Sequence, residues 1–205
     1  MPAQILGFNT LPSEGFICYD SSFLIRIFGN INSPNKPPLS SKLKNQIRFD
    51  KILRQKCKEY ADKLRKSDIC TYVCDCVVQE CLFLIIKWKL MEDSDKQYRD
   101  INKWENLYKK NPKIIGSYAP LIEDFYSFTN AIGLIPLDYV PLKNEVLTTY
   151  ARNIIESCSV LPMDAYIVEH ARKYGINTFA TCDTDWTRID NITIHIPHPL
   201  IPKTS

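Results

Sequence analysis

The strongest constraint on the fold of this 205-residue chain is the alternation of short apolar segments with longer amphipathic ones. Phe-Ile-Cys-Tyr at 16–19 has the length and composition of a buried strand. The pattern predicts strands at residues 16–19, 69–78, 176–180 and 192–196. Helices are expected after Asp20 and at residues 42–66, 80–91, 118–132, 144–157 and 162–174, with a further helical stretch within 93–112. Strands separated by helices favour an α/β domain with a mainly parallel sheet.

The composition is that of a globular protein, with 45% hydrophobic and 24% charged residues. It excludes a disordered chain. The longest apolar run, 81–88, is interrupted by Lys87 and is too short to span a bilayer, so we expect no membrane association. The N-terminal residues do not resemble a signal peptide, which predicts a cytoplasmic, reducing location.

The eight cysteines are therefore expected to be free thiols. Four of them, Cys70, Cys74, Cys76 and Cys81, are close in sequence, but their spacing matches no paired zinc-binding pattern. Most stand among apolar residues, where a free cysteine packs as a small hydrophobe, and we favour this interpretation over a zinc site. The three histidines stand in no catalytic motif and are interpreted as structural.

Positive charge is concentrated in one segment. The net charge is only +3, yet residues 36–66 hold eleven Lys and Arg residues against three acidic ones. Most of these cations fall on one side of the helix expected at 42–66. This side has two interpretations, a solvated face or a contact for a phosphate backbone. The candidate contacts are Lys44, Arg48, Lys51 and Lys58.

Acidic residues follow the predicted strands. Asp20 follows the strand 16–19, Glu80 follows 69–78, and Asp183 and Asp185 follow 176–180. Ligands of open α/β sheets bind beyond the carboxyl ends of the strands, so these acids are expected at one edge. Asp164 begins the helix 162–174 on its apolar side, where a carboxylate is costly unless it is paired or bound to a cation.

Converging carboxylates repel one another, and a divalent cation removes that repulsion. An oxygen-only ligand set favours Mg²⁺ or Mn²⁺, either of which can orient water on a phosphodiester. Each acid also has a local interpretation as a helix cap or turn residue. Their joint position at strand ends favours a metal site.

Three stretches resemble the motifs of PIN domains. The segment GFICYDSSFLIRIF is similar to the first motif, in which Asp and Ser or Thr follow an apolar strand. The segment VVQECLFLI is similar to the second, a Glu that opens a helix. The segment LPMDAYIVEHARKYGINTFATCDTDW resembles the third and fourth together and is the most specific.

The resemblance implies one PIN-like domain over residues 1–205, with a three-layer α/β/α fold and a helical insertion or extension at 92–157. It implies a ribonuclease dependent on Mg²⁺ or Mn²⁺, similar to VapC. The implied catalytic residues and metal ligands are Asp20, Glu80, Asp164 and Asp183, with Asp185 close by. Ser22 and Thr181 stand where the family has hydroxyls that line the site. Because Cys182 separates Thr181 from the acids, the choice between Asp183 and Asp185 as the main ligand stays open.

The resulting hypothesis is hydrolysis of RNA by water held on the metal. A role as the toxin of a toxin–antitoxin pair, with an antitoxin partner, and a homodimer are compatible with it. Two alternatives remain: a nuclease of related fold that acts on DNA or on flaps, and a PIN-like RNA-binding or interaction module without catalytic activity.

Overall fold

The central element is a parallel sheet. The structure, a computed structural model, describes residues 1–29, 41–138 and 146–200, without the side chains of 41–46 and 146–150. In strand order, the sheet consists of β1 (Gln4–Gly7), β6 (Thr193–Ile196), β5 (Thr178–Ala180), β2 (Phe16–Tyr19), β3 (Cys70–Val73) and β4 (Ile135–Pro136). All neighbouring strands are parallel. The carboxyl ends of these strands therefore meet at one edge.

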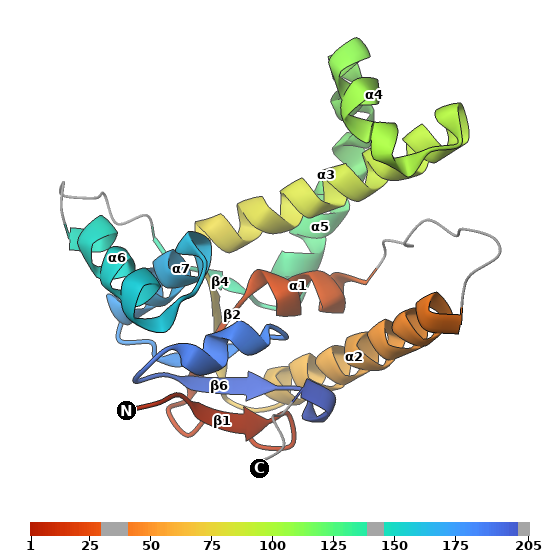
Figure 1. Cartoon of the computed structure of the whole chain (residues 1–205). Helices are drawn as coiled ribbons and strands as arrows, with labels where there is room; N and C mark the ends of the chain where they lie inside the picture. The colour runs from red at the N-terminus through yellow and green to blue at the C-terminus, as the bar shows by residue number, and fades with distance from the viewer. Residues whose placement is uncertain (30–40, 139–145, 201–205) are drawn as a thin grey trace.

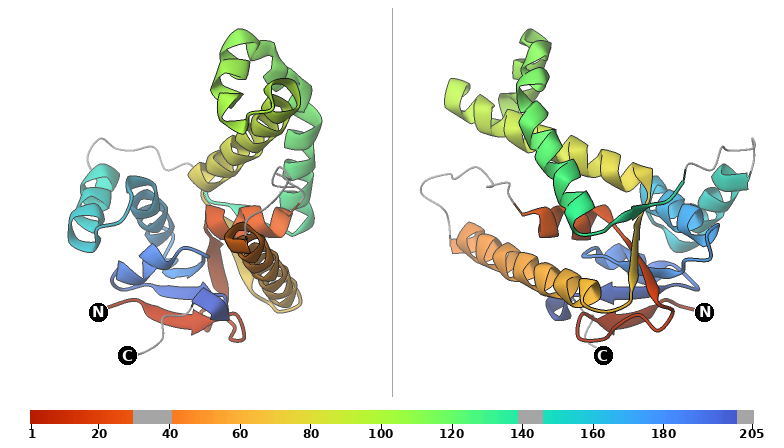
Figure 2. Two further views of the ribbon diagram at one scale, coloured as in Figure 1. Left: turned by 45° about the vertical axis from the view of Figure 1, so that its right-hand side comes forward. Right: turned by 180° about the vertical axis from the view of Figure 1, so that it is seen from behind.

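Helices cover both faces of the sheet (Figures 1 and 2). Helices α1 (Ser21–Phe28) and α2 (Ser41–Arg65) pack together on one face. Helices α6 (Val146–Cys158) and α7 (Pro162–Arg172) pack together on the other. Parallel strands need such crossover connections, which bury the sheet on both sides. The expected three-layer α/β/α fold is confirmed.

A helical arm projects from this body (Figure 1). It consists of α3 (Asp75–Tyr98), η1 (Ile101–Lys103), α4 (Trp104–Lys110), η2 (Pro112–Tyr118) and α5 (Ala119–Ala131). Its outer part has a small apolar core of its own, formed by Leu90, Leu107 and Tyr118. The stretch 92–157 thus includes the outer arm, strand β4 in the sheet and most of α6 beside α7.

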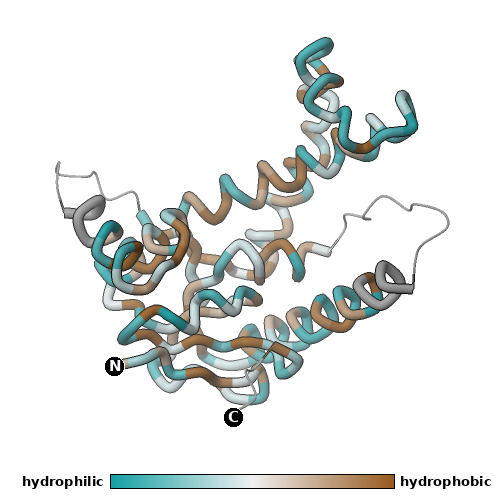
Figure 3. Tube along the Cα trace, in the orientation of Figure 1, coloured by the Kyte–Doolittle hydropathy of each residue, from teal (hydrophilic) through white to brown (hydrophobic). Residues whose placement is uncertain are grey.

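The main core lies between the sheet and its helices, where the apolar segments of the trace gather (Figure 3). Trp186 is fully buried against Phe179 of β5, with ring centroids 5.1 Å apart. Trp186 follows β5 in η3 (Thr184–Arg188), so its burial fixes the path of the chain after the strand. His170 and His195 are buried in this body, and the Nε2 atom of His170 lies 3.1 Å from the Asp138 carbonyl oxygen.

The expected strand at 69–78 and helix at 80–91 are wrong in their boundaries. β3 ends at Val73 and α3 begins at Asp75, so Glu80 lies in the second turn of the helix. The alternating, β-branched residues after Val73 suggested a strand, but Val77 and Cys81 pack one helical turn apart on the core side of α3. Burial of the α3 face that carries Val77 and Cys81 outweighed the preference of these residues for a strand. Strands β1 and β4 were not expected from the sequence.

Tyr60 connects α2 to the sheet. Its hydroxyl lies 2.8 Å from Nδ1 of His195 on β6, and its ring stacks on Phe8 at a centroid distance of 4.3 Å. Burial lowers the pKa of His195 to about 4. A neutral imidazole therefore forms part of the interface between α2 and the sheet.

No helix within the described ranges is long and apolar enough to cross a membrane. The eight cysteines are free thiols. Cys57 of α2 and Cys182, which follows β5, place their sulfur atoms 3.3 Å apart in the interior.

Replacing Tyr60 with Phe should lower the free energy of unfolding by about 1–2 kcal/mol, because a buried imidazole nitrogen loses its partner while the ring contacts stay. Urea denaturation at pH 7 measures this, and the exposed Tyr108 provides the matched control Tyr108→Phe. Equal midpoints for the two variants would contradict the role given to the hydroxyl.

Candidate metal centre

Asp20 lies at the centre of the acidic edge. It directly follows β2, caps the N-terminus of α1, and is only 2% exposed. Its backbone N–H donates to the Ala180 carbonyl of β5 at 3.0 Å, so the end of β2 is held beside the end of β5. An extended backbone at Asp20 allows the side chain to accept from the N–H of Ser22, as N-cap residues do.

The two carboxylate oxygens of Asp20 have different surroundings. Oδ2 accepts from the Ser22 N–H at 3.2 Å, from the Ser22 hydroxyl, and from the Thr181 hydroxyl at 2.8 Å. Oδ1 accepts from the Ser21 hydroxyl at 3.4 Å, the one side-chain hydrogen bond to this oxygen from the described residues. One oxygen therefore fixes the orientation of the side chain, and the other is available to a ligand.

The hydroxyls of Ser22 and Thr181 extend this arrangement to the loop after β5. The Ser22 hydroxyl accepts from the Cys182 N–H at 2.8 Å, and that of Thr181 accepts from the Asp183 N–H at 2.9 Å. Both hydroxyls were expected near the acids from the sequence, and both contact Asp20. These bonds position Asp183 relative to Asp20.

Asp164 and Asp183 are each held through one oxygen. The indole Nε1–H of Trp186 donates to Oδ1 of Asp164 at 3.2 Å, and the Asp185 N–H donates to Oδ1 of Asp183 at 2.8 Å. Asp164 lies in the first turn of α7, and Asp183 caps η3. Trp186 is a buried core residue, and no sequence motif indicates its bond to Asp164.

The charges of neighbouring acids act on Asp164 and Glu80. Burial raises the pKa of Asp20 above its usual value. Burial, together with the charges of Asp20, Asp183 and Glu80, raises the pKa of Asp164 to about 7. Burial and the charges of Asp20 and Asp183 also raise the pKa of Glu80. These carboxylates repel one another, as expected for a site that gains from bound positive charge.

Asp185 is oriented differently. Its carboxylate forms an ion pair with Arg188 at 2.6 Å and its side chain is 53% exposed. Its charge does not contribute to the raised pKa of Asp20, Glu80 or Asp164. The arrangement therefore favours Asp183 over Asp185 as the acid facing the site. The i,i+3 spacing of Asp185 and Arg188 was the sequence signal for this pair.

The donor set fits a divalent cation. It consists of carboxylate oxygens, which Mg²⁺ and Mn²⁺ prefer, with hydroxyls behind them. Across the described residues, the side chains do not come together in a group of three or more His, Cys, Asp or Glu close enough to hold an ion as they stand. Oδ1 of Asp20 nevertheless accepts only a long hydrogen bond from a side chain of the described residues, and the charges of Asp20, Asp183 and Glu80 all act on Asp164.

Arg26 is a cation near the site that was not singled out in the sequence. It lies one helical turn after Ser22 and donates to the Ser22 carbonyl at 2.6 Å. It also lies 3.7 Å from Asp50 of α2. Among the four expected cations, Arg48, Lys51 and Lys58 are exposed on α2, and the side chain of Lys44 lies outside the described part. The Lys58 amine lies beside Gly29 at the end of α1.

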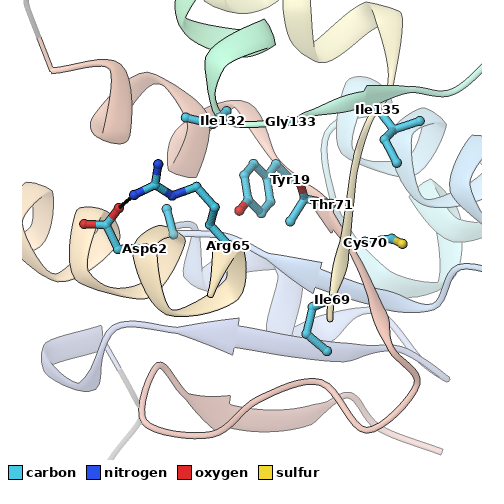
Figure 4. A pocket seen from close by; sticks show the side chains of 10 residues that line it. Tyr19, Asp62, Arg65, Ile69, Cys70, Thr71, Ile132, Gly133 and Ile135 are labelled. Carbon is cyan, nitrogen blue, oxygen red and sulfur yellow. Dashed lines mark hydrogen bonds and ion pairs between the residues drawn. The ribbon is translucent and has the colours of Figure 1, made fainter. Parts of the chain in front are cut away.

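A cavity of about 290 Å³ lies apart from these acids (Figure 4). It is lined by Tyr19 and Thr71 of the sheet, by α2 and by the chain before β4. Successive residues of a strand face opposite sides, so Tyr19 and Asp20 contribute to different places. Arg65 at this cavity is paired with Asp62 at 3.3 Å. The cavity is not part of the acidic site.

Comparison with known proteins points to the same family as the sequence motifs. Residues 123–192 match the PIN domain. Over 158 residues the chain is 25% identical to ribonuclease VapC2 of Methanocaldococcus jannaschii, an alignment that covers 73% of this chain and 93% of the relative. The match includes Asp164 and Asp183, and the parallel sheet between helices is the PIN-like fold. The resemblance of this chain to the PIN domain family is thus confirmed.

Proposed function

We propose that this protein is a nuclease that hydrolyses RNA phosphodiester bonds with Mg²⁺ or Mn²⁺ held by Asp20, Glu80, Asp164 and Asp183. The observation that carries the proposal is the convergence of these four carboxylates, in which the charges of Asp20, Asp183 and Glu80 raise the pKa of Asp164. A structural role alone does not account for acids placed so that their charges raise the pKa of Asp164 and Glu80.

The hydrogen bonds indicate which oxygens would face the ion. Asp20, Asp164 and Asp183 each use one oxygen to hold the side chain in place, against Thr181, Trp186 and the Asp185 N–H respectively. The opposite oxygens are Oδ1 of Asp20 and Oδ2 of Asp164 and Asp183. Glu80 approaches from α3 and completes the set.

When bound, Mg²⁺ or Mn²⁺ would neutralise these charges, polarise a phosphate oxygen and lower the pKa of a coordinated water. The protein contributes the fixed orientation of Asp20, through Ser22 and Thr181, and a carboxylate that accepts the proton of the attacking water. A proton acceptor works best with a pKa near the working pH, which favours Asp164 for this role.

RNA is proposed as the substrate because the relative from Methanocaldococcus jannaschii is a ribonuclease. The proposed location is the cytoplasm, and the whole chain is proposed to act as one PIN-like domain with 92–157 as its helical addition. A toxin role, an antitoxin partner and a homodimer stay predictions. Light scattering of the purified protein, alone and with the product of any small neighbouring gene, tests the last two.

Replacing Asp20 or Asp164 with Asn should lower cleavage of single-stranded RNA at least 100-fold and leave the circular dichroism spectrum unchanged, because one metal-binding charge is lost while the shape is kept. Asp185→Asn should stay within about threefold of the unchanged protein, since Arg188 already neutralises Asp185. The assay compares RNA with DNA, and Mg²⁺ and Mn²⁺ with EDTA. Cleavage that persists in both active-site variants or in EDTA would overturn the assignment, and preferential DNA cleavage would favour the DNA alternative.

In EDTA at pH 8, Asp164→Asn should be more stable than the unchanged protein by about 2–4 °C in melting temperature, an effect on the order of 1 kcal/mol for a partly exposed group. A carboxyl with a raised pKa in the folded state is most stabilising below its unfolded pKa, and that stability is lost as pH rises through about 7. The gain should therefore shrink between pH 8 and pH 5. Differential scanning calorimetry measures it, and a variant less stable at pH 8 would refute the repulsion.

Metal binding should weaken as pH falls. Because the proton on Asp164 competes with the ion below about pH 7, the Mn²⁺ concentration that half-stabilises the protein should rise about fivefold between pH 7 and pH 6. Thermal melting over a Mn²⁺ titration at each pH provides the measurement. Asp164→Asn should show a weaker pH dependence, because only Asp20 and Glu80 then keep a raised pKa, and a pH-independent midpoint in the unchanged protein would count against Asp164 as a ligand.

A further inference from the structure

One face of α3 continues from the acidic site into the arm. Residues three, four and seven positions apart lie on the same side of a helix, so Phe83, Leu84 and Lys87 share the side of Glu80. At 1.5 Å per residue, Phe83 lies about 4.5 Å and Lys87 about 10.5 Å along the axis from Glu80. Figure 2 shows α3 running outward from the sheet along this direction.

Phe83 is exposed, although other residues of the same helix pack into the core. Its side chain is 54% exposed, the highest fraction among the exposed aromatic residues of the described ranges. Val77, Cys81 and Ile85 of the same helix are completely buried. The ring therefore contributes little to the core. It lies about one helical turn from Glu80, on the same side of α3.

Lys87 stands next to aromatic rings. Its ammonium lies 5.9 Å from the centroid of Phe83 and 5.5 Å from that of Trp104, at the start of α4. In the described part of the chain, Lys87 has no acidic residue within ion-pair distance. Lys89 differs in this respect, because Glu92 at 3.1 Å and Asp93 at 3.4 Å neutralise it. Lys87 is half-buried beside these rings, and no acid of the described residues neutralises its charge through an ion pair.

We propose that Phe83 and Lys87 form a binding strip for single-stranded RNA, in which Phe83 stacks on a base and Lys87 contacts a phosphate adjacent to the one at the acids. The strip rests on the proposed function, because it places a neighbouring nucleotide relative to the hydrolysed bond. An exposed ring with a neighbouring cation is the combination that single-stranded nucleic acid uses, through stacking and charge.

The charges around the site support this occupant over an apolar protein partner. Four acids would repel the RNA backbone, and attraction just outside them is needed to hold the strand. Lys87 supplies it two turns of helix from Glu80. A protein partner that buried Phe83 would also have to bury the charge of Lys87, at a cost unless it supplied an acid.

The test measures binding of a fluorescein-labelled 12-nucleotide single-stranded RNA of mixed sequence by fluorescence anisotropy, in the Asp20→Asn background so that the probe stays intact. Phe83→Ala should weaken binding about tenfold through lost stacking. Lys87→Gln should weaken binding and reduce the slope of log affinity against log salt concentration by about 0.7, the value for one phosphate contact on a single strand.

Two variants on the same arm serve as matched controls. Tyr126→Ala removes an aromatic residue of α5 that is 46% exposed, and Lys89→Gln removes a lysine of α3 that is already paired. Both should bind RNA within twofold of the background protein. Circular dichroism checks that all four variants are folded.

The outcomes separate the strip from the nuclease assignment. If the unchanged protein cleaves RNA but Phe83→Ala and Lys87→Gln bind as the controls do, the strip is refuted and the nuclease assignment stands. If both variants lose affinity while no metal-dependent cleavage is found, the strip stands and the protein is an RNA-binding module. Absence of RNA binding by the Asp20→Asn protein, or equal losses in all four variants, would overturn the strip. If Phe83→Ala and Lys87→Gln bind RNA as the controls do but bind a protein partner more weakly than the controls do, this face would be assigned to that partner.

Discussion

The burial of the Asp20 carboxylate is the constraint on which the arrangement of the site depends. It is 2% exposed, and burial raises its pKa, so the interior must provide hydrogen bonds to keep it there. Ser22 at the start of α1 and Thr181 after β5 provide them, and the same hydroxyls accept N–H groups of the loop that carries Asp183. The cost of one buried acid is thus offset by bonds that join β2, α1 and β5. Without Asp20, these three elements lose their common partner.

The same edge concentrates charge that the protein alone does not neutralise. Two cations of this region are engaged elsewhere: Arg188 with Asp185, and Arg26 with the Ser22 carbonyl beside Asp50. Within the described residues, Asp20, Glu80, Asp164 and Asp183 form no ion pair, and the charges acting on Asp164 reduce the stability of the folded chain above neutral pH. A site that reduces stability in this way is typical of a place selected for binding rather than for folding.

The helical arm changes the interpretation of the positive charge. The sequence directed attention to the basic side of the helix at 42–66, where Arg48 and Lys51 are exposed on α2. The structure adds a second candidate, Lys87, which lies on the helix that carries Glu80. α3 starts at Asp75, so Glu80 lies inside the helix rather than at its first residue. The position of Glu80 relative to β3, and with it that of Lys87, is therefore set by the first turn of α3. The corrected boundary therefore bears directly on where substrate could bind.

By itself, the sequence determined the fold class and suggested which acids lie at the edge of the sheet. Apolar runs and the residues that follow them are local signals, and a parallel sheet necessarily gathers its carboxyl ends at one edge. Asp20 and Asp183 were proposed for this reason, and Asp164 because it lies on the apolar side of its helix. Tertiary structure was needed for the start of α3, for the short strands β1 and β4, and for the separation of Asp183 from Asp185. These features depend on contacts between residues distant in the chain, such as the Trp186 bond to Asp164, and on the ion pair of Asp185 with Arg188. Residue patterns alone do not show whether such contacts or the local propensity of a segment decides its structure.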